Sequence, residues 1–207
     1  MNTRAKPPIH AVLRSALLVT LGSAGLAACA PGAGTPGPAP LAGADIGGAF
    51  TLTSSTGKTV AWDDFRGSYA VVYFGYAYCP DVCPTDMQRT AQGLRILKER
   101  NPALASRTQA VFISIDPERD TPEVVGEFVS AFSDDLVGLT GSPEAVKAAA
   151  DAFRVYYKKG EETPNGGYLV DHTNIVYLFD PDGEPLAMLP TNEGSEAVAD
   201  EIEKWAS

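Results

Sequence analysis

Two apolar runs, AVVYFGY at 70–76 and AVFISI at 110–115, constrain the fold more than any other feature of the sequence. Both are rich in β-branched and aromatic residues and have almost no polar interruption. Such runs are typical of strands buried on both faces, in a sheet covered by helices. Segments with helical spacing follow each run. This alternation is typical of an α/β protein whose sheet contains parallel strands.

The remaining segments complete this pattern. Short runs around the turn at 55–57 indicate an N-terminal β-hairpin, and the turn at 181–183 joins a second pair of strands. Pro84 suits the first position of a helix, and Thr121 is a good N-cap for another. We therefore expect a thioredoxin-like α/β fold, with a central mixed sheet flanked by helices.

The first 28 residues differ in composition from the rest of the chain. They carry Arg4, Lys6 and Arg14, no acidic residue, and then the apolar stretch LLVTLGSAGLAA, which is the pattern of a secretion signal. LAAC at 26–29 resembles the lipobox of bacterial lipoproteins, in which the cysteine is diacylated and becomes the new N-terminus. We predict a signal peptide at 1–28 and a lipidated Cys29. The alternative is a chance cysteine near the cleavage site of a soluble protein.

The segment after this cysteine is mostly Pro, Gly and Ala and has no periodicity. We predict a lipid-anchored tether at 29–44 and one domain at 45–207. The formal net charge is -10, and loss of the signal would remove basic residues but no acid. Because an acidic surface repels phosphate backbones, we expect no nucleic-acid partner and membrane association through the lipid alone. We also expect a monomer.

The stretch YAYCPDVCPTD, at 76–86, places Cys79 and Cys83 between an apolar run and a helix. Such a junction lies at the carboxyl edge of a parallel sheet, the usual place for function in open α/β folds. If Pro84 is the first helical residue, Cys83 is the N-cap, where the helix dipole lowers the pKa of a thiol. A thiolate is both a nucleophile and a metal ligand.

The spacing of the two thiols leaves two kinds of chemistry open. Three residues separate them, against two in the usual redox motif, so a Cys79–Cys83 disulfide can still form. Two thiolates also suit Cu(I), a soft ion that accepts low coordination numbers. Beyond the signal and Cys29, the sequence has no third cysteine and a single histidine, which argues against a closed four-ligand zinc site.

That histidine, His172, lies in YLVDHTN just before a predicted strand. If its loop lies at the same sheet edge as the cysteines, the imidazole completes a three-coordinate set that suits Cu(I) and helps to accommodate Cu(II). Asp171 is then a candidate to support the imidazole by accepting a hydrogen bond from it. The alternative is an ordinary surface or core histidine beside a solvated acid.

The charged loop DPERD at 116–120 follows the second apolar run. We expect Asp116 and Arg119 to orient the loop or to recognise a partner; the alternative is a solvated loop whose charges pair with one another. Tyr73, Tyr76 and Tyr78 surround the thiols, and the sequence leaves open whether they pack or make contacts at the site.

Six motifs carry a family resemblance that covers nearly the whole domain. They are DFRG (64–67), YFGYAYCPDVCP (73–84), ISIDPERDTP (113–122), GLTG (138–141), VYYKK (155–159) and YLVDHTNIVYLFDPDG (168–183). Taken together, these residues resemble the SCO family (synthesis of cytochrome c oxidase) of copper-binding assembly proteins. The resemblance implies a thioredoxin-like fold and copper held by Cys79, Cys83 and His172. It also implies delivery of copper to, or thiol reduction at, the dinuclear copper centre of a respiratory oxidase subunit that faces the outside of the membrane. The predicted lipid anchor and tether fit that role and would hold the domain on the extracytoplasmic side of the bacterial cell membrane.

Three functions compete at this stage. The first is a copper metallochaperone that is not an enzyme. The second is a thiol-disulfide oxidoreductase that acts on the oxidase subunit or serves as a redox sensor. A peroxiredoxin-like peroxidase shares the layout, but we find no support near the thiols for its peroxide-activating arginine and threonine.

Overall fold

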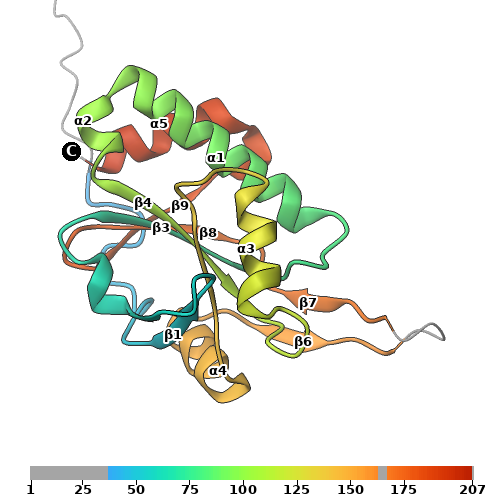
Figure 1. Ribbon diagram of the computed structural model, residues 1–207. Coiled ribbons are helices and arrows are strands. Elements are labelled where there is room, and N and C mark those ends of the chain that lie inside the picture. Colours follow the sequence, from blue (N-terminus) through green and yellow to red (C-terminus); the bar gives the residue numbers. More distant parts are fainter. Residues whose placement is uncertain (1–36, 163–166, 207) are drawn as a thin grey trace, which may run out of the picture. The chain divides into compact units, whose positions relative to one another are not determined.

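The computed structural model describes residues 37–162 and 167–206, which fold around a seven-stranded sheet (Figure 1). The strand order is β2-β1-β5-β4-β3-β8-β9. The central strands β3, β4 and β5 run parallel, whereas the strands on both sides of them join antiparallel. The strands are β1 (Thr51–Ser54), β2 (Thr59–Ala61), β3 (Tyr69–Gly75), β4 (Thr108–Ser114), β5 (Val137–Thr140), β8 (Val176–Phe179) and β9 (Pro185–Leu189).

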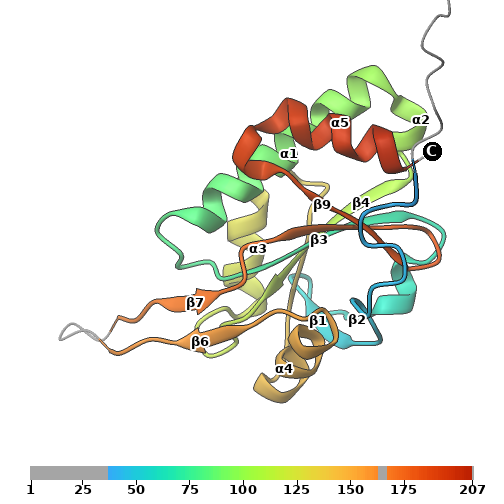
Figure 2. The same ribbon diagram turned by 180° about the vertical axis from the view of Figure 1, so that it is seen from behind.

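Helices cover both faces of the sheet (Figures 1 and 2). The pair α1 and α5 packs side by side on one face, and α4 lies on the other. Every residue of β3 is buried, as its unbroken apolar sequence predicts. The helices are α1 (Val82–Arg100), α2 (Pro102–Ala105), α3 (Pro122–Ser130), α4 (Pro143–Ala152) and α5 (Ser195–Trp205), with short 3₁₀ turns η1 (Trp62–Phe65) and η2 (Thr191–Glu193).

An aromatic cluster fills the core on the α4 side of the sheet. Trp62 packs edge-on against Phe153 and Phe179, with ring centroids 5.1 and 5.2 Å apart. Phe50 lies 5.7 Å from Trp62 and joins the N-terminal segment to the same cluster. Edge-to-face aromatic pairs stabilise a core beyond the area that they bury, so this cluster stabilises the sheet whose edge carries the site.

The register of the central strands positions the functional loops. Gly75 pairs with Ser114, so the carboxyl ends of β3 and β4 lie side by side. The cysteine loop leaves β3 at this edge, and the charged loop DPERD leaves β4 next to it. Two loops far apart in the sequence are therefore neighbours in space.

A separate two-stranded sheet projects from the same edge. It pairs β6 (Tyr157–Lys159) with β7 (Val170–His172), antiparallel, with Tyr157 opposite His172 (Figure 1). In the described part of the chain, neither strand is hydrogen-bonded into the seven-stranded sheet. The position of this hairpin thus depends on contacts other than the main ladder.

The thioredoxin-like fold and the N-terminal hairpin are confirmed. The N-cap of α3 is confirmed as well, since the Thr121 side chain accepts a hydrogen bond from the N–H of Val124. The sequence did not predict β7 or the short helix α2, which begins after Asn101 at the point where α1 ends.

Two predicted boundaries differ from the structure. Helix α1 begins at Val82, two residues before Pro84, so Cys83 lies inside the first turn and Asp81 is the N-cap. The boundary at residue 45 falls within packed structure, because the N–H of Leu41 donates to Leu186 O at 3.0 Å and its side chain packs on the core. The predicted signal peptide, Cys29 and the first part of the tether lie outside the described residues. Within the described ranges, no helix combines the length and the hydrophobicity that crossing a membrane requires.

Candidate metal centre

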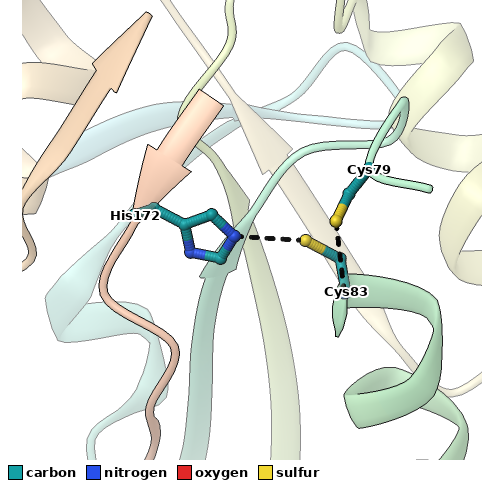
Figure 3. Close-up of side chains that lie close together, drawn as sticks. All are labelled: Cys79, Cys83 and His172. Atoms are coloured by element: carbon teal, nitrogen blue, oxygen red, sulfur yellow. Dashed lines mark hydrogen bonds between the residues drawn. The ribbon is translucent and has the colours of Figure 1, made fainter. Parts of the chain in front are cut away.

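Three side chains from three elements meet at the carboxyl edge of the sheet. Cys79 comes from the loop after β3, Cys83 from the first turn of α1, and His172 from the end of β7 (Figure 3). Their ligand atoms, two sulfurs and one ring nitrogen, all lie within 4.8 Å of one another. Residues 89 positions apart are thus in direct contact, with Cys83 Sγ 3.4 Å from His172 Nε2.

The cysteine loop is folded tightly onto the end of β3. The backbone N–H of Cys83 donates to the sulfur of Cys79 at 3.4 Å, and Cys79 N–H donates to Tyr76 O at 3.2 Å. Gly75 lets the helix approach the strand closely, because a Cβ there would lie only 3.1 Å from Cys83 Sγ. Cys83 is fully buried and Cys79 is 8% exposed, so Cys79 is the more exposed of the two residues.

The pKa predicted for Cys83 was wrong in direction. Burial of the side chain raises the pKa of this thiol far above its usual range, and the neighbouring Cys79 raises it further. The helix N-terminus favours a thiolate only where desolvation does not outweigh it. In the metal-free protein Cys83 is therefore a neutral thiol, whose S–H can donate to the imidazole.

His172 is oriented by a backbone carbonyl. Its Nδ1 lies 3.0 Å from Thr173 O, and because a carbonyl only accepts, Nδ1 carries the proton of the neutral ring. Nε2 is then left with a lone pair directed at Cys83 Sγ (Figure 3). Burial lowers the pKa of the imidazole, so the ring is neutral at pH 7 and ready to act as a ligand.

Two buried tyrosines frame the imidazole. The rings of Tyr73 and Tyr76 stand edge-on to His172, with centroids 6.2 and 5.9 Å away. The hydroxyl of Tyr73 donates to Asn174 Oδ1 at 2.9 Å, which ties β3 to the segment just after the histidine. These tyrosines therefore pack around the site and contact it, whereas Tyr78 is 55% exposed at its rim.

The other candidate residues lie outside the ligand set. Strand alternation turns the exposed Asp171 away from the buried side of the hairpin, and the hydrogen-bond partner of the imidazole is Thr173 O instead. Asp116 is buried, and Arg119 forms an ion pair with it at 2.5 Å, next to the cysteine loop. The two charges thus pair with each other, as the alternative interpretation had it, but the pair is largely buried and not solvated.

Sequence reasoning missed Asp120 as a support of the site. Its side chain is fully buried, and Oδ2 accepts hydrogen bonds from Ala77 N–H at 2.9 Å and from Ser114 Oγ at 2.6 Å. Asp120 therefore fixes the start of the cysteine loop from the neighbouring loop after β4. Nothing in the sequence around Asp120 indicates these contacts, because Ala77 is 43 residues away along the chain.

The arrangement fits a soft, three-coordinate metal ion. If the bond lengths of zinc are taken as a guide, about 2.3 Å to sulfur and about 2.0 Å to nitrogen, a trigonal ion holds its donor atoms about 3.7–4.0 Å apart. The observed spacing, from 3.4 Å up to at most 4.8 Å, meets this with shifts of about 1 Å or less. Two thiols and one neutral imidazole are the donors that suit copper.

Comparisons with known proteins agree with this geometry. The SCO1/SenC family model matches residues 38–207. SenC of Rhodobacter capsulatus is 43% identical over 85% of this chain and 75% of its own length. The human mitochondrial SCO1 homologue is 40% identical over 76% of this chain and 52% of its own length. The chain spans about half the length of the curated mitochondrial relatives from human and Arabidopsis thaliana.

Among solved structures, ScoI of Bradyrhizobium japonicum with copper bound is 37% identical and superimposes with a TM-score of 0.70. The match covers 77% of this chain and 99% of that protein. The solved relative therefore shares nearly the whole described domain and carries copper.

Proposed function

This chain belongs to the SCO1/SenC family, and from that premise we propose that it is a membrane-anchored copper metallochaperone. It carries copper on Cys79, Cys83 and His172 to the dinuclear copper centre of a respiratory oxidase subunit, or prepares the thiols of that centre. The observation that carries the proposal is the convergence of two sulfurs and one imidazole nitrogen within 4.8 Å.

The three ligand residues make different contributions to copper binding. The two sulfurs supply soft donors for Cu(I), and Nε2 of His172 adds the nitrogen that Cu(II) prefers. Binding requires the Cys83 thiol to lose its proton, so metal uptake is coupled to proton release. Cys79 lies at the more accessible side of the pair and is the sulfur that we expect to meet an incoming acceptor first.

A three-coordinate site also suits release. An acceptor thiolate can approach an ion that has an open position and form a bond before the first ligands leave, so copper passes without becoming free in solution. The family resemblance implies that the acceptor is the copper-binding subunit of a cytochrome c oxidase. A lipid on Cys29 would concentrate the domain near such an integral membrane client, on the extracytoplasmic side of a bacterial membrane.

Copper titration of the reduced protein tests this function. In a Cys29→Ser background only the two site cysteines remain, and we expect one copper per chain, with thiolate-to-copper charge-transfer absorption in the Cu(II) form. Cys79→Ser, Cys83→Ser and His172→Ala should each remove that absorption. Full copper binding and an unchanged spectrum in all three variants would contradict the proposal.

The paired thiols also favour a second function, a thiol-disulfide oxidoreductase. A thiolate of the pair attacks a client disulfide and forms a mixed disulfide, which the other thiolate then resolves. Two electrons and two protons pass to the client, and the protein is left with a Cys79–Cys83 disulfide. The proximity of the two sulfurs supports this reaction without any need for the imidazole.

A variant that lacks the imidazole, His172→Ala, distinguishes the two proposed functions. If thiol exchange is the main role, His172→Ala should retain most of the electron transfer to an oxidised client peptide, while either cysteine variant loses it. If copper delivery is the main role, all three variants should fail to load the client's copper-binding domain. Equal loss of client reduction in all three would argue against an oxidoreductase that works through the thiols alone.

A further inference from the structure

The His172 hairpin needs a support that the main sheet does not give it. Both cysteines are fixed directly to β3 and α1, but the strand that carries the imidazole belongs to the separate sheet β6–β7. Small movements of that hairpin would separate Nε2 from the sulfurs by more than a copper bond tolerates. Contacts between the hairpin and the rest of the described domain must therefore hold the imidazole in place.

Arg119, in the charged loop after β4, makes several of these contacts. Its guanidinium lies 3.5 Å from the centroid of the ring of Tyr168, which comes two residues before β7, and donates to Tyr168 O at 2.9 Å. It also donates through Nε to the buried carboxylate of Asp116 at 2.5 Å. Tyr168 closes the ring of contacts, because its hydroxyl donates to the other oxygen of Asp116 at 2.6 Å.

The same guanidinium reaches the cysteine loop. It lies 5.1 Å from the ring of Tyr78, which precedes Cys79, and 5.8 Å from the ring of Tyr76. Tyr76 in turn stands edge-on to the imidazole at 5.9 Å. Arg119 thus lies between the two segments that carry ligands and contacts both, yet it touches none of the three donor atoms among the contacts described.

The planar shape of the side chain suits this position. A guanidinium stacks on aromatic rings and donates in fixed directions at the same time, whereas an ammonium group is a point charge. Lys159, in β6, shows the contrast on the same ring. Its Nζ lies 4.0 Å from the Tyr168 centroid and forms an ion pair with Glu118 of the same loop, but both side chains are exposed, so this pair contributes little.

From these contacts we infer that Arg119 is a positioning residue for the copper site. With Asp116 and Tyr168 it holds the His172 hairpin against the cysteine loop, at the spacing that the three donors need. This inference rests on the proposed copper function for its consequence in metal binding, but the positioning itself exists without copper. Loss of Arg119 should weaken the binding of Cu(II), which depends on the nitrogen donor, more than the binding of Cu(I), which the two sulfurs can hold alone.

The test compares Arg119→Gln with the matched control Lys159→Ala, which also removes a cation from the Tyr168 ring. In the reduced full chain, Arg119→Gln should weaken Cu(II) binding about 10–100-fold, the range expected for residues that orient metal ligands. Cu(I) affinity should change far less, and the charge-transfer band should shift. Arg119→Lys should restore only part of the Cu(II) affinity, and Lys159→Ala should behave like the parent protein.

A metal-free measurement separates this inference from the copper function. Amide hydrogen exchange in 157–159 and 170–172 should accelerate in Arg119→Gln and in the milder Tyr168→Phe, which keeps the ring and loses only the hydroxyl contact to Asp116. Lys159→Ala, which loses an exposed ion pair to Glu118, should change exchange far less than Arg119→Gln. If the parent protein bound no copper, the proposed copper function would be refuted, but the faster hydrogen exchange in the two variants would still support the positioning role of Arg119. Unchanged exchange in both variants, or equal losses for Cu(I) and Cu(II), would overturn the positioning role.

Discussion

The close approach of Cys83 to the end of β3 gives a sharp prediction at Gly75. A Cβ at this position would lie 2.9 Å from Tyr73 Cε1, 3.0 Å from Phe112 Cε2 and 3.1 Å from Cys83 Sγ. All three neighbours are buried, so none can swing into solvent. Gly75→Ala must therefore push the two rings or the sulfur aside.

The size of the effect follows from two opposing contributions to the free energy of unfolding. Overpacking a core costs about 1–3 kcal/mol, while replacing glycine stabilises by about 0.4–1 kcal/mol through the unfolded chain. We predict a net loss of up to about 2.6 kcal/mol, centred on about 1.3 kcal/mol, or a Tm lower by up to roughly 10 °C for a domain of this size. Copper affinity should fall as well, because the displaced atoms include a ligand.

Urea unfolding of the metal-free, reduced protein measures the first effect, and copper titration measures the second. Gly37→Ala is the matched control, since an added Cβ there would meet nothing within 4 Å. A Gly75→Ala variant that unfolds at the parent midpoint and binds copper with parent affinity would refute the account of how Cys83 is placed.

Three further predictions concern protons, the loop support and a distant cap. Burial raises the pKa of Cys83, so its thiol is protonated at neutral pH and copper must displace that proton. The affinity for Cu(I) should therefore rise about tenfold per pH unit for each proton released. Copper titrations between pH 6 and 8 that give the same affinity at each pH would exclude this coupling. Asp120→Ala leaves the N–H of Ala77 and the hydroxyl of Ser114 without their acceptor, and should cost about 1–3 kcal/mol in urea unfolding and weaken copper binding together. Ser142→Ala removes the N-cap of α4 and should cost about 1 kcal/mol while leaving copper affinity unchanged, because α4 lies on the far side of the sheet.

Much of the fold could be predicted because its signals are local. The unbroken apolar runs identified β3 and β4, and the turn at 181–183 identified the β8–β9 pair. Pairings between distant segments leave no such pattern. The strand β7 is only three residues long, and it forms because residues 157–159 lie opposite it across the hairpin.

The site shows the same division between local and non-local effects. The sequence and the family resemblance together pointed to Cys79, Cys83 and His172. The cysteine loop follows β3 and His172 precedes β8, which pairs antiparallel with β3, so both segments lie at one edge of the sheet. The pKa of Cys83 was predicted wrongly, since the depth of burial depends on Gly75 and on rings packed from other strands. The orienting partner of His172 is a backbone carbonyl, which any residue could supply, so no side chain in the sequence could reveal it.

X-ray absorption spectroscopy of the copper-loaded Cys29→Ser protein tests the central claim most directly. The account predicts one copper ion bound by two sulfur atoms and one imidazole nitrogen, and loss of the nitrogen shell alone in His172→Ala. A first shell that contains no nitrogen in the parent protein, or one that His172→Ala leaves unchanged, would contradict it.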